Sequence, residues 1–346
     1  MKLDMNPGTI KKHAKFFFCV LIFYSGFLSL YLSIYKRAKK KQLAVILLYH
    51  RFKEENEDSV LPKLYIKSFE QQMSYLKRWY HIIPLDEIVV NIKNKEKFSC
   101  PTIVITIDDG FKDNYDLAYP ILRSFNLPAT IFLTSGLINT QKAPWVDEIG
   151  IALSNTEITE LHVGELFEEE VVTISSNEHK AKTLHRIYEK LVSLDHKKKA
   201  YLVAALLSTL KENAYLETRE RFMLSWEEIE KMSQNNISFG AHTLTHPTLS
   251  RMSFEDAVHE IIESKRVIEK QLGIRVKHFA IPNGKNGDFT EDLRKFCRNG
   301  EFESVSFTNF GYVTNETDPY SLPRVCPDAR LCVFAVELAR LLTTAK

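Results

Sequence analysis

The chain has 346 residues, a formal net charge of +2 and 45% hydrophobic residues, with 12 Gly and 12 Pro. This length can bury one large core or two modest ones, and the composition excludes wholesale disorder, a collagen-like repeat and a small disulfide scaffold. Residues 1–41 hold nine Lys or Arg against one acid, a net charge of +8, which leaves −6 for the other 305 residues. This mildly acidic body argues against nucleic acid as a main partner.

The first segment is typical of a membrane anchor. Phe16–Tyr35 contains no charged residue and spans 20 residues, which is long enough to cross the hydrocarbon core as a helix. A cleavable signal peptide has a shorter apolar region and a small-residue cleavage site, so we predict an uncleaved transmembrane helix. Basic residues flank it on both sides and leave its orientation open. We therefore divide the chain into an anchor, residues 1–41, and a body, residues 42–346.

Short apolar runs alternate with helical patterns in the body, in a rhythm that indicates an α/β fold with a parallel sheet or barrel. The first run, Leu43–Tyr49, is continuous, as expected of a strand buried on both faces. Further strands are predicted at Thr102–Ile107, Ala129–Leu133, Ile237–Ala241, Lys277–Ile281 and Ser304–Thr308. Helices are predicted from Ser68, around Leu117–Phe125, and from Ser253 to a stop at Gly273.

One stretch, at about 157–223, interrupts this rhythm. After the strand-like run Val171–Ile174, apolar residues follow helical spacing over Leu184–Val192 and again through Tyr201–Leu210. We interpret the stretch as a mostly helical insertion. The alternative is that these are two of the outer helices of the barrel.

Two adjacent acids follow a predicted strand, in the position where active sites of parallel α/β folds form. Asp108, Asp109 and Gly110 come directly after Thr102–Ile107. One of two neighbouring acids can ligate a metal ion while the other stays free as a general base. A solvated Asp-Asp-Gly turn is the alternative.

Histidines follow two other predicted strands. His242 and His246 come after Ile237–Ala241, and two imidazoles four residues apart can converge on one divalent ion. With Asp109 they make a set of three ligands that leaves room for water, as in a catalytic metal site. His50 closes the first strand, either as a core histidine or as an acid–base group.

Three segments carry a resemblance to a known family. In order, TIDDGFKDNY, GAHTLTHPTLS and FAIPNG resemble the metal-dependent polysaccharide deacetylases, the NodB-like family called carbohydrate esterase family 4. The family's T-F-D-D-G motif corresponds to Thr106–Gly110, and its H-[ST]-x-x-H motif corresponds to His242–His246. The resemblance covers roughly residues 43–330 and leaves out the apolar N-terminal run and the insertion.

The resemblance implies a fold and a set of roles. The fold is a distorted (β/α) barrel. A divalent metal ion, zinc by preference, is held by Asp109, His242 and His246, and Asp108 is the general base. A backbone N–H near Tyr115 is the implied donor to the oxyanion.

Departures from the family pattern point to one branch of it. The third motif, Ala280–Gly284, lacks the family's Arg, and no His follows His278 to supply the late Leu-x-His motif. Both features resemble the branch that acts on exopolysaccharide poly-N-acetylglucosamine, whose barrel is circularly permuted with the catalytic His in a Tyr-His element on the first strand. Tyr49 and His50 match that element, which implies His50 as general acid. Arg324 is the candidate partner of the base, with a structural ion pair as the alternative.

The function implied is a membrane-anchored hydrolase that removes N-acetyl groups from a cell-surface or exported polysaccharide of the N-acetylglucosamine type, with its catalytic domain outside the cytoplasm. The alternatives are a deacetylase of peptidoglycan, chitin oligomers or a non-sugar amide, and a catalytically dead glycan-binding protein. Trp145 and Asp147 are candidates to line the sugar groove, although a core Trp is the more common case.

Overall fold

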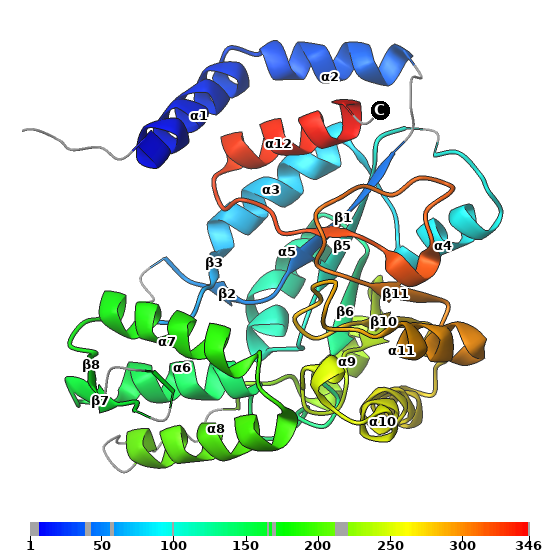
Figure 1. The fold of residues 1–346 in the computed structure, drawn as a ribbon. Coiled ribbons are helices and arrows are strands. Elements are labelled where there is room, and N and C mark those ends of the chain that lie inside the picture. The colour runs from blue at the N-terminus through cyan, green and yellow to red at the C-terminus, as the bar shows by residue number, and fades with distance from the viewer. Residues whose placement is uncertain are drawn as a thin grey trace, which may run out of the picture.

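The structure, a computed structural model, describes residues 7–38, 43–55, 59–98, 100–164, 166–167, 171–211 and 221–344. Its centre is an eight-stranded sheet. The strands are β1 (Ala44–Tyr49), β4 (His81–Ile82), β5 (Thr102–Ile107), β6 (Ala129–Leu133), β9 (Ile237–Ala241), β10 (His278–Ala280), β11 (Ser304–Ser306) and β12 (Arg324–Val325). All their pairings are parallel, in the order β11-β10-β9-β6-β5-β1-β12, and β4 also pairs with β5 (Figure 1).

The sheet curls into a nearly closed barrel, which confirms the predicted architecture. The last strand, β12, pairs with the first, β1, with Arg324 opposite Ile46. Just before β12, the backbone N–H of Leu322 donates to Val305 O of β11 at 2.9 Å, and Phe307 N–H donates back to Leu322 O at 2.8 Å. The first strand, β1, is therefore an internal strand of the barrel sheet, between β5 and β12. His50 follows its carboxyl end, at the same end of the barrel as the carboxyl ends of the other parallel strands.

The strands are apolar because both of their faces are covered. All six residues of β1 and all six of β5 are buried. The covering helices are α3 (Ile66–Trp79), α4 (Leu85–Lys93), α5 (Tyr119–Ser124), α9 (Trp226–Ser233), α10 (Phe254–Leu272), α11 (Glu291–Phe296) and α12 (Leu331–Thr344). The Ser253 hydroxyl accepts from Asp256 N–H at 3.1 Å and Gly273 ends α10 with a φ of 65°, so both predicted helix boundaries are confirmed. The predicted start at Ser68 is wrong: α3 begins at Ile66, directly after the short strand β3 (Leu64–Tyr65), which pairs with β2 (Phe52–Lys53).

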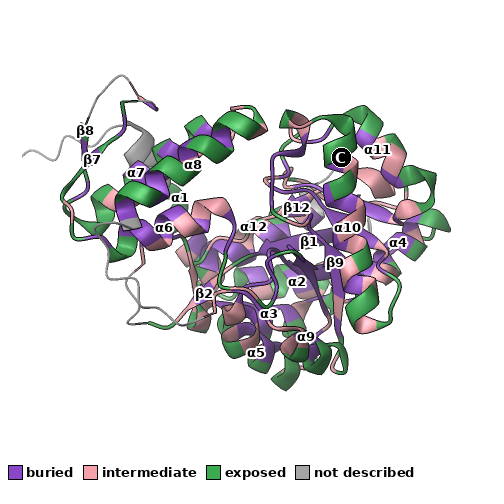
Figure 2. Ribbon diagram, turned by 90° about the horizontal axis from the view of Figure 1, so that it is seen from below, coloured by how far each residue is buried: buried purple, intermediate pink, exposed green. Residues whose placement is uncertain are grey.

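The insertion forms a compact unit beside the barrel. It consists of α6 (Trp145–Asn155), the hairpin strands β7 (Glu160–His162) and β8 (Val171–Thr173), α7 (Asn177–Leu191) and α8 (His196–Lys211). Leu153, Ile187 and Leu210 belong to a buried cluster separate from the barrel core. Seen from below, these helices stand to one side of the sheet (Figure 2). They are therefore not outer helices of the barrel, and the unit begins at α6, earlier than the sequence pattern indicated.

The N-terminal run is two helices, so the prediction of one continuous transmembrane helix is wrong. α1 (Pro7–Tyr24) and α2 (Phe27–Ala38) meet at Gly26, whose φ of 78° lies in the left-handed region and breaks the helix. No single helix in the described ranges has the length and hydropathy of a membrane span. The pair His13–Tyr24 and Phe27–Tyr35 meets that test jointly, with a bend of 69°. Both helices lie beside α12 (Figure 1).

Gly240 lets β9 fit between β6 and β10. A Cβ at this position would lie 2.5 Å from the Phe132 ring and 2.9 Å from His278 O. We expect Gly240→Ala to lower the free energy of unfolding by about 1–3 kcal/mol, because the surrounding strands cannot move apart without cost. Urea denaturation measures the change. Gly287→Ala, where no atom lies within 4 Å of the added Cβ, is the matched control and should unfold as the parent does.

Candidate active site

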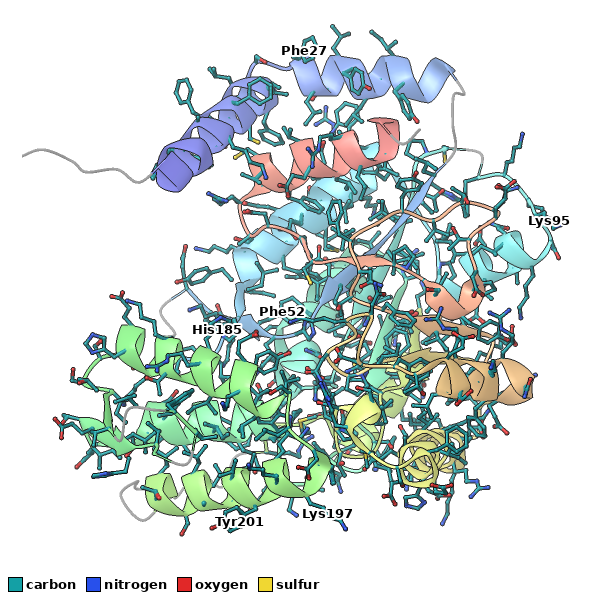
Figure 3. All side chains as sticks on the ribbon, viewed as in Figure 1. Phe27, Phe52, Lys95, His185, Lys197 and Tyr201 are labelled. Atoms are coloured by element: carbon teal, nitrogen blue, oxygen red, sulfur yellow. The ribbon has the colours of Figure 1, made fainter. Side chains whose placement is uncertain are left out.

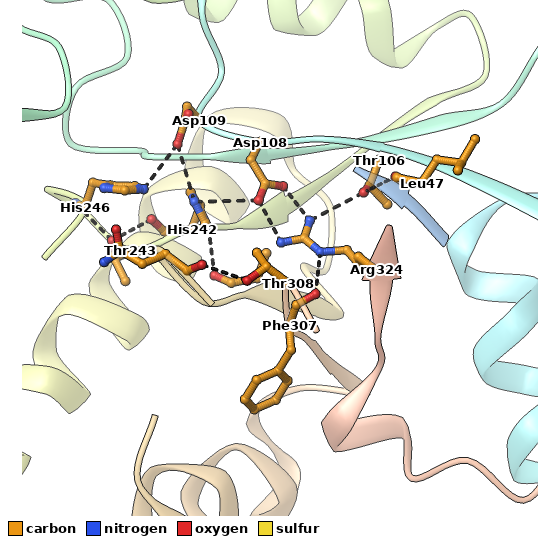
Figure 4. Close-up of polar contacts among 12 residues, drawn as sticks. Leu47, Thr106, Asp108, Asp109, His242, Thr243, His246, Phe307, Thr308 and Arg324 are labelled. Carbon is orange, nitrogen blue, oxygen red and sulfur yellow. Dashed lines mark hydrogen bonds and ion pairs between the residues drawn. The ribbon is translucent and has the colours of Figure 1, made fainter. Parts of the chain in front are cut away.

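Three side chains converge at the carboxyl ends of β5 and β9. Asp109 Oδ1 lies 3.4 Å from Nε2 of both His242 and His246 (Figure 4). One possible ligand atom from each residue lies within 4.8 Å of the others. The three residues expose only 6%, 1% and 9% of their surfaces. The structure thus brings together the Asp-His-His set that the sequence singled out.

The local backbone is bent to achieve this convergence. Asp109, Thr243 and His246 have φ values of 76°, 65° and 61°, in the left-handed region that side chains other than Gly seldom adopt. Residues held in such conformations concentrate at functional sites, where the surrounding structure has to enforce them. Gly110, with a φ of 84°, packs so closely on the Leu133 side chain that an added Cβ would lie 2.8 Å from it.

The donor atoms of this trio suit a divalent cation. The carbonyl of Ala280 lies 2.8 Å from His242 Nδ1, so Nδ1 carries the proton and the lone pair of Nε2 faces Asp109. Asp109 Oδ1 and His246 Nδ1 are buried and find no hydrogen-bond partner among the described residues. A buried acceptor without a partner is costly, and a cation beside Asp109 removes that cost. One carboxylate and two imidazoles are a ligand set that zinc accepts.

The protonation states of Asp109 and His246 suit a metal site. Burial lowers the pKa of His242, but the charges of Asp108 and Asp109 outweigh it and the net shift is upward, so a cation would have to displace a proton there. Burial opposes ionisation of Asp109, but His242 and His246 hold the pKa of its carboxyl below the ordinary range. Burial lowers the pKa of His246 to about 4 despite the attraction of Asp109. An anionic carboxylate and a neutral imidazole are the forms that bind metal ions.

Asp108 is clamped by Arg324. Arg324 donates from Nη1 to Asp108 Oδ1 at 2.6 Å and from Nη2 to Oδ2 at 2.7 Å, and from Nε to Phe307 O at 3.2 Å. Burial raises the pKa of Asp108, but the charges of Arg324 and His242 outweigh it and the net shift is downward. Oδ2 also lies 3.9 Å from His242 Nε2. Arg324, on the two-residue strand β12, therefore keeps the Asp108 carboxylate ionised next to Asp109, His242 and His246.

We expect Arg324→Met to destabilise the fold by about 3–5 kcal/mol at neutral pH, because it leaves the buried Asp108 carboxylate without its partner. The pKa of Asp108 is depressed in the folded state, so the contribution of the pair is complete above the unfolded value of about 3.9 and is lost as pH falls through the folded value. Urea denaturation at several pH values should therefore show that the difference in free energy of unfolding between the parent and Arg324→Met becomes smaller in acid. Arg324→Lys, which keeps the charge without the two-pronged contact, should lose less. An equal loss at every pH would point to packing alone.

The loop between the two histidines is held by Glu260 of α10, which sequence reasoning missed. Its carboxylate accepts from Leu244 N–H at 2.8 Å, Thr245 N–H at 3.0 Å and the Thr245 hydroxyl at 2.7 Å. Only the tertiary fold brings α10 to this loop, although the negative charge on a residue of the helix core face is a usable signal.

Glu260→Gln should weaken divalent-ion affinity about 10–100-fold, because the amide cannot accept all three hydrogen bonds and the loop that aims His246 loosens. Zinc titration by calorimetry measures the affinity. Glu263→Gln, on the same helix but paired with Arg266 at the surface, is the matched control. Unchanged affinity in Glu260→Gln would mean that the loop holds its shape without this carboxylate.

A cavity of about 890 Å³ opens over the cluster. Asp108, Asp109, His242, His246 and His50 are among the residues that line it. Apolar lining residues come from the segment before β3 and from the insertion: Val60, Leu61, Val146 and Leu184. His50 is exposed, so it is not a core histidine. The cavity therefore combines acid–base and ligand groups with apolar side chains.

Other residues singled out from the sequence are placed differently. Trp145 stacks on Tyr188 with ring centroids 5.9 Å apart and does not line the cavity, whereas Tyr188 does. Tyr115 stacks on Tyr119 and is not among the residues that line the cavity, and the expected oxyanion donor, a backbone N–H near Tyr115, stays a prediction. Asp147 does line the cavity.

Arg51, which the sequence did not suggest, connects Asp147 to the site's first strand. It donates to Asp147 Oδ1 at 3.2 Å and to Asp113 Oδ2 at 3.1 Å. Burial raises the pKa of Asp147 to about 7 despite the attraction of Arg51. The residue after His50 therefore fastens this turn to α6 of the insertion.

A family model described as polysaccharide deacetylase matches residues 95–301. A putative polysaccharide deacetylase of Bacillus subtilis is 34% identical over 102 residues, 29% of this chain and 35% of the relative. A poly-beta-1,6-N-acetyl-D-glucosamine N-deacetylase of Staphylococcus aureus is 28% identical over 193 residues, 51% of this chain and 65% of the relative. The chain thus spans less than two thirds of the length of either relative.

Solved structures share the fold. The deacetylase PplD of Streptococcus pyogenes, in complex with acetate, superposes with a TM-score of 0.57 at 18% identity, over 88% of this chain and 99% of the other. IcaB of Ammonifex degensii gives a TM-score of 0.55 at 16% identity, over 86% and 97%. Because the family model covers more than half of the chain, including both acids and both histidines of the cluster, the chain belongs to the polysaccharide deacetylase family.

Proposed function

We propose that the protein is a metal-dependent N-deacetylase of an acetylated glycan of the poly-N-acetylglucosamine type. The observation that carries the proposal is the convergence of Asp109, His242 and His246 beside the ionised Asp108, in a cavity that His50 also lines. This combination offers a cation site, a base and a second acid–base group around one space, which are the parts that amide hydrolysis requires.

In this proposal Asp109, His242 and His246 hold a divalent ion, zinc by its ligand preference. The ion, when bound, supplies Lewis acidity that makes water more acidic and polarises the acetamide carbonyl. Asp108 accepts the proton of the attacking water, and Arg324 keeps it ionised and oriented for that task. His50 donates a proton to the departing amine as the carbon–nitrogen bond breaks. The products are acetate and a free amino sugar.

The choice of glycan follows from similarity and from the cavity. The Staphylococcus aureus relative is named for poly-beta-1,6-N-acetyl-D-glucosamine, which supports a polymer of N-acetylglucosamine as substrate. The cavity falls within the volumes of about 300–1,000 Å³ that ligand sites commonly have. Tyr188 lines the cavity and offers a ring that can contact a pyranose face. We place the catalytic domain outside the cytoplasm, where acetylated polysaccharides are finished.

Acetate release by the full chain tests this proposal. The panel consists of β-1,6- and β-1,4-linked N-acetylglucosamine oligomers, peptidoglycan and simple acetamides, each with zinc and with a chelator. We expect release from the β-1,6-linked oligomer, loss with chelator and recovery when zinc is restored. Asp108→Asn should be inactive, and Asp256→Asn, an exposed acid at the start of α10, should match the parent. Chelator-resistant turnover, or binding of the oligomer without turnover, would refute the proposal.

A further inference from the structure

The helix pair α1–α2 has two apolar sides, and only one of them is covered. Among the described residues, nine of the sixteen exposed large hydrophobic side chains fall within residues 16–34. On α2, Phe27, Leu30, Tyr31 and Ile34 recur at helical spacing and form one exposed stripe. On α1 the exposed set is Phe16, Phe17, Phe18, Leu21 and Tyr24. Together these residues are called the outer stripe below. Phe27 lies at the top of Figure 3, at the start of α2.

The other side of the pair is packed on the catalytic domain. Leu28 and Leu32 are 6% and 2% exposed and share a buried cluster with residues of α12. Cys19 is 1% exposed and packs on Cys332 and Val333 of α12. Burial explains the apolar residues on this inner side. It does not explain the outer stripe, because a surface that faces water seldom gathers so many large apolar side chains on one segment.

Polar contacts fix the pair in this orientation along its length. Lys15 Nζ lies 2.5 Å from Glu337 Oε1 of α12, and the Tyr35 hydroxyl donates to Leu342 O at 2.9 Å. These contacts hold the start of the apolar run near the middle of α12 and its end near the C-terminus of α12. A straight membrane crossing would require Gly26 to straighten and Leu28 and Leu32 to leave their buried positions.

Charge indicates what covers the outer stripe. Residues 1–41 carry a net charge of +8, and the basic residues lie on both sides of the apolar run. An apolar helix face with basic flanks is typical of helices that lie in the interface of a bilayer containing anionic lipids. A second copy of this segment would bring +8 against +8. The charge therefore favours an anionic lipid surface over self-association.

We propose that α1–α2 is an interfacial membrane anchor. It stays packed on α12, inserts the outer stripe into the boundary between headgroups and acyl chains of an anionic bilayer, and does not cross it. In Figure 1 the anchor lies at the top of the molecule, above α12, and the insertion lies at the lower left, beside the barrel. The candidate active site, which the insertion helps to line, therefore faces away from the bilayer, toward the aqueous phase and a polymeric glycan. The proposal does not depend on the proposed hydrolysis.

Flotation of the full chain with vesicles tests whether an anionic lipid surface covers the outer stripe. We expect binding to phosphatidylcholine vesicles that contain phosphatidylglycerol, at least about tenfold weaker binding without it, and weakening by salt. The double variant Leu21→Glu with Leu30→Glu should abolish flotation. The milder double variant Leu21→Ser with Leu30→Ser should reduce it. Tyr201→Glu with Phe310→Glu, two exposed hydrophobic residues outside the anchor, is the matched control and should float as the parent does. Equal flotation of the Leu21→Glu/Leu30→Glu variant, or dimerisation through the stripe without lipid binding, would overturn the proposal.

Protease access in cells tests whether the anchor crosses. An epitope placed at the N-terminus and the catalytic body should be digested from the same face of the membrane, because both ends of the pair lie on one side. Digestion of one with protection of the other would show a crossing and overturn the proposal.

Discussion

Replacing His242 with alanine is expected to abolish both zinc retention and acetate release. The variant removes the Nε2 atom that faces Asp109 at 3.4 Å, and two remaining ligands hold a catalytic zinc ion poorly. Metal content after gel filtration and the acetate assay measure the two losses. His259→Ala, on the exposed side of α10, is the matched control and should retain both.

The stability of the His242 variant separates a catalytic site from a structural one. His242 lies at the end of β9, so its metal-free form should unfold cooperatively, close to the metal-free parent. A variant that fails to fold would instead assign the cluster a structural role.

His50→Ala is expected to lower turnover by about 10²–10⁴-fold while zinc binding stays normal. An amine is a poor leaving group without a proton. Two imidazoles of the cavity lining, His50 and His185, lie outside the cation cluster. His185 belongs to α7 of the insertion, whereas His50 follows β1, whose Tyr49 lies opposite Ile107, the residue before Asp108. Turnover and zinc binding are measured on the same preparation. His162→Ala, an exposed histidine on β7, should leave both measurements unchanged. Near-normal turnover of His50→Ala would assign the proton to another group.

Most of the longer strands of the barrel could be predicted from short, mainly apolar runs in the sequence. The predicted strands at 102–107, 129–133 and 237–241 coincide with β5, β6 and β9, because strands buried on both faces contain no charged residue and only small polar ones such as Thr106 and Thr130. β12 was missed because two residues are too short to show a period. The break at Gly26 was also missed, since composition and length alone do not distinguish one helix from two.

The residues of the candidate site likewise fall into two groups, those that a sequence motif marks and those that only the fold reveals. Asp108, Asp109, His242 and His246 carry a signal in short motifs, each within a single loop after a strand. Arg51 carries none, and Glu260 shows only a charge on the core face of its helix, because the partners of both residues lie on other elements. Arg324 was identified through a missing residue elsewhere, and its bidentate contact with Asp108 came only from the pairing of β12 with β1.

Anomalous diffraction at the zinc edge, from crystals of the full chain grown with zinc, tests the proposed cation site. We expect a single peak bounded by Asp109, His242 and His246, with ligand distances of about 2.0–2.2 Å, and Asp108 beside it still paired with Arg324. Saturating zinc with no peak at this cluster, or an ion bound by other residues while these three side chains are well ordered, would contradict it.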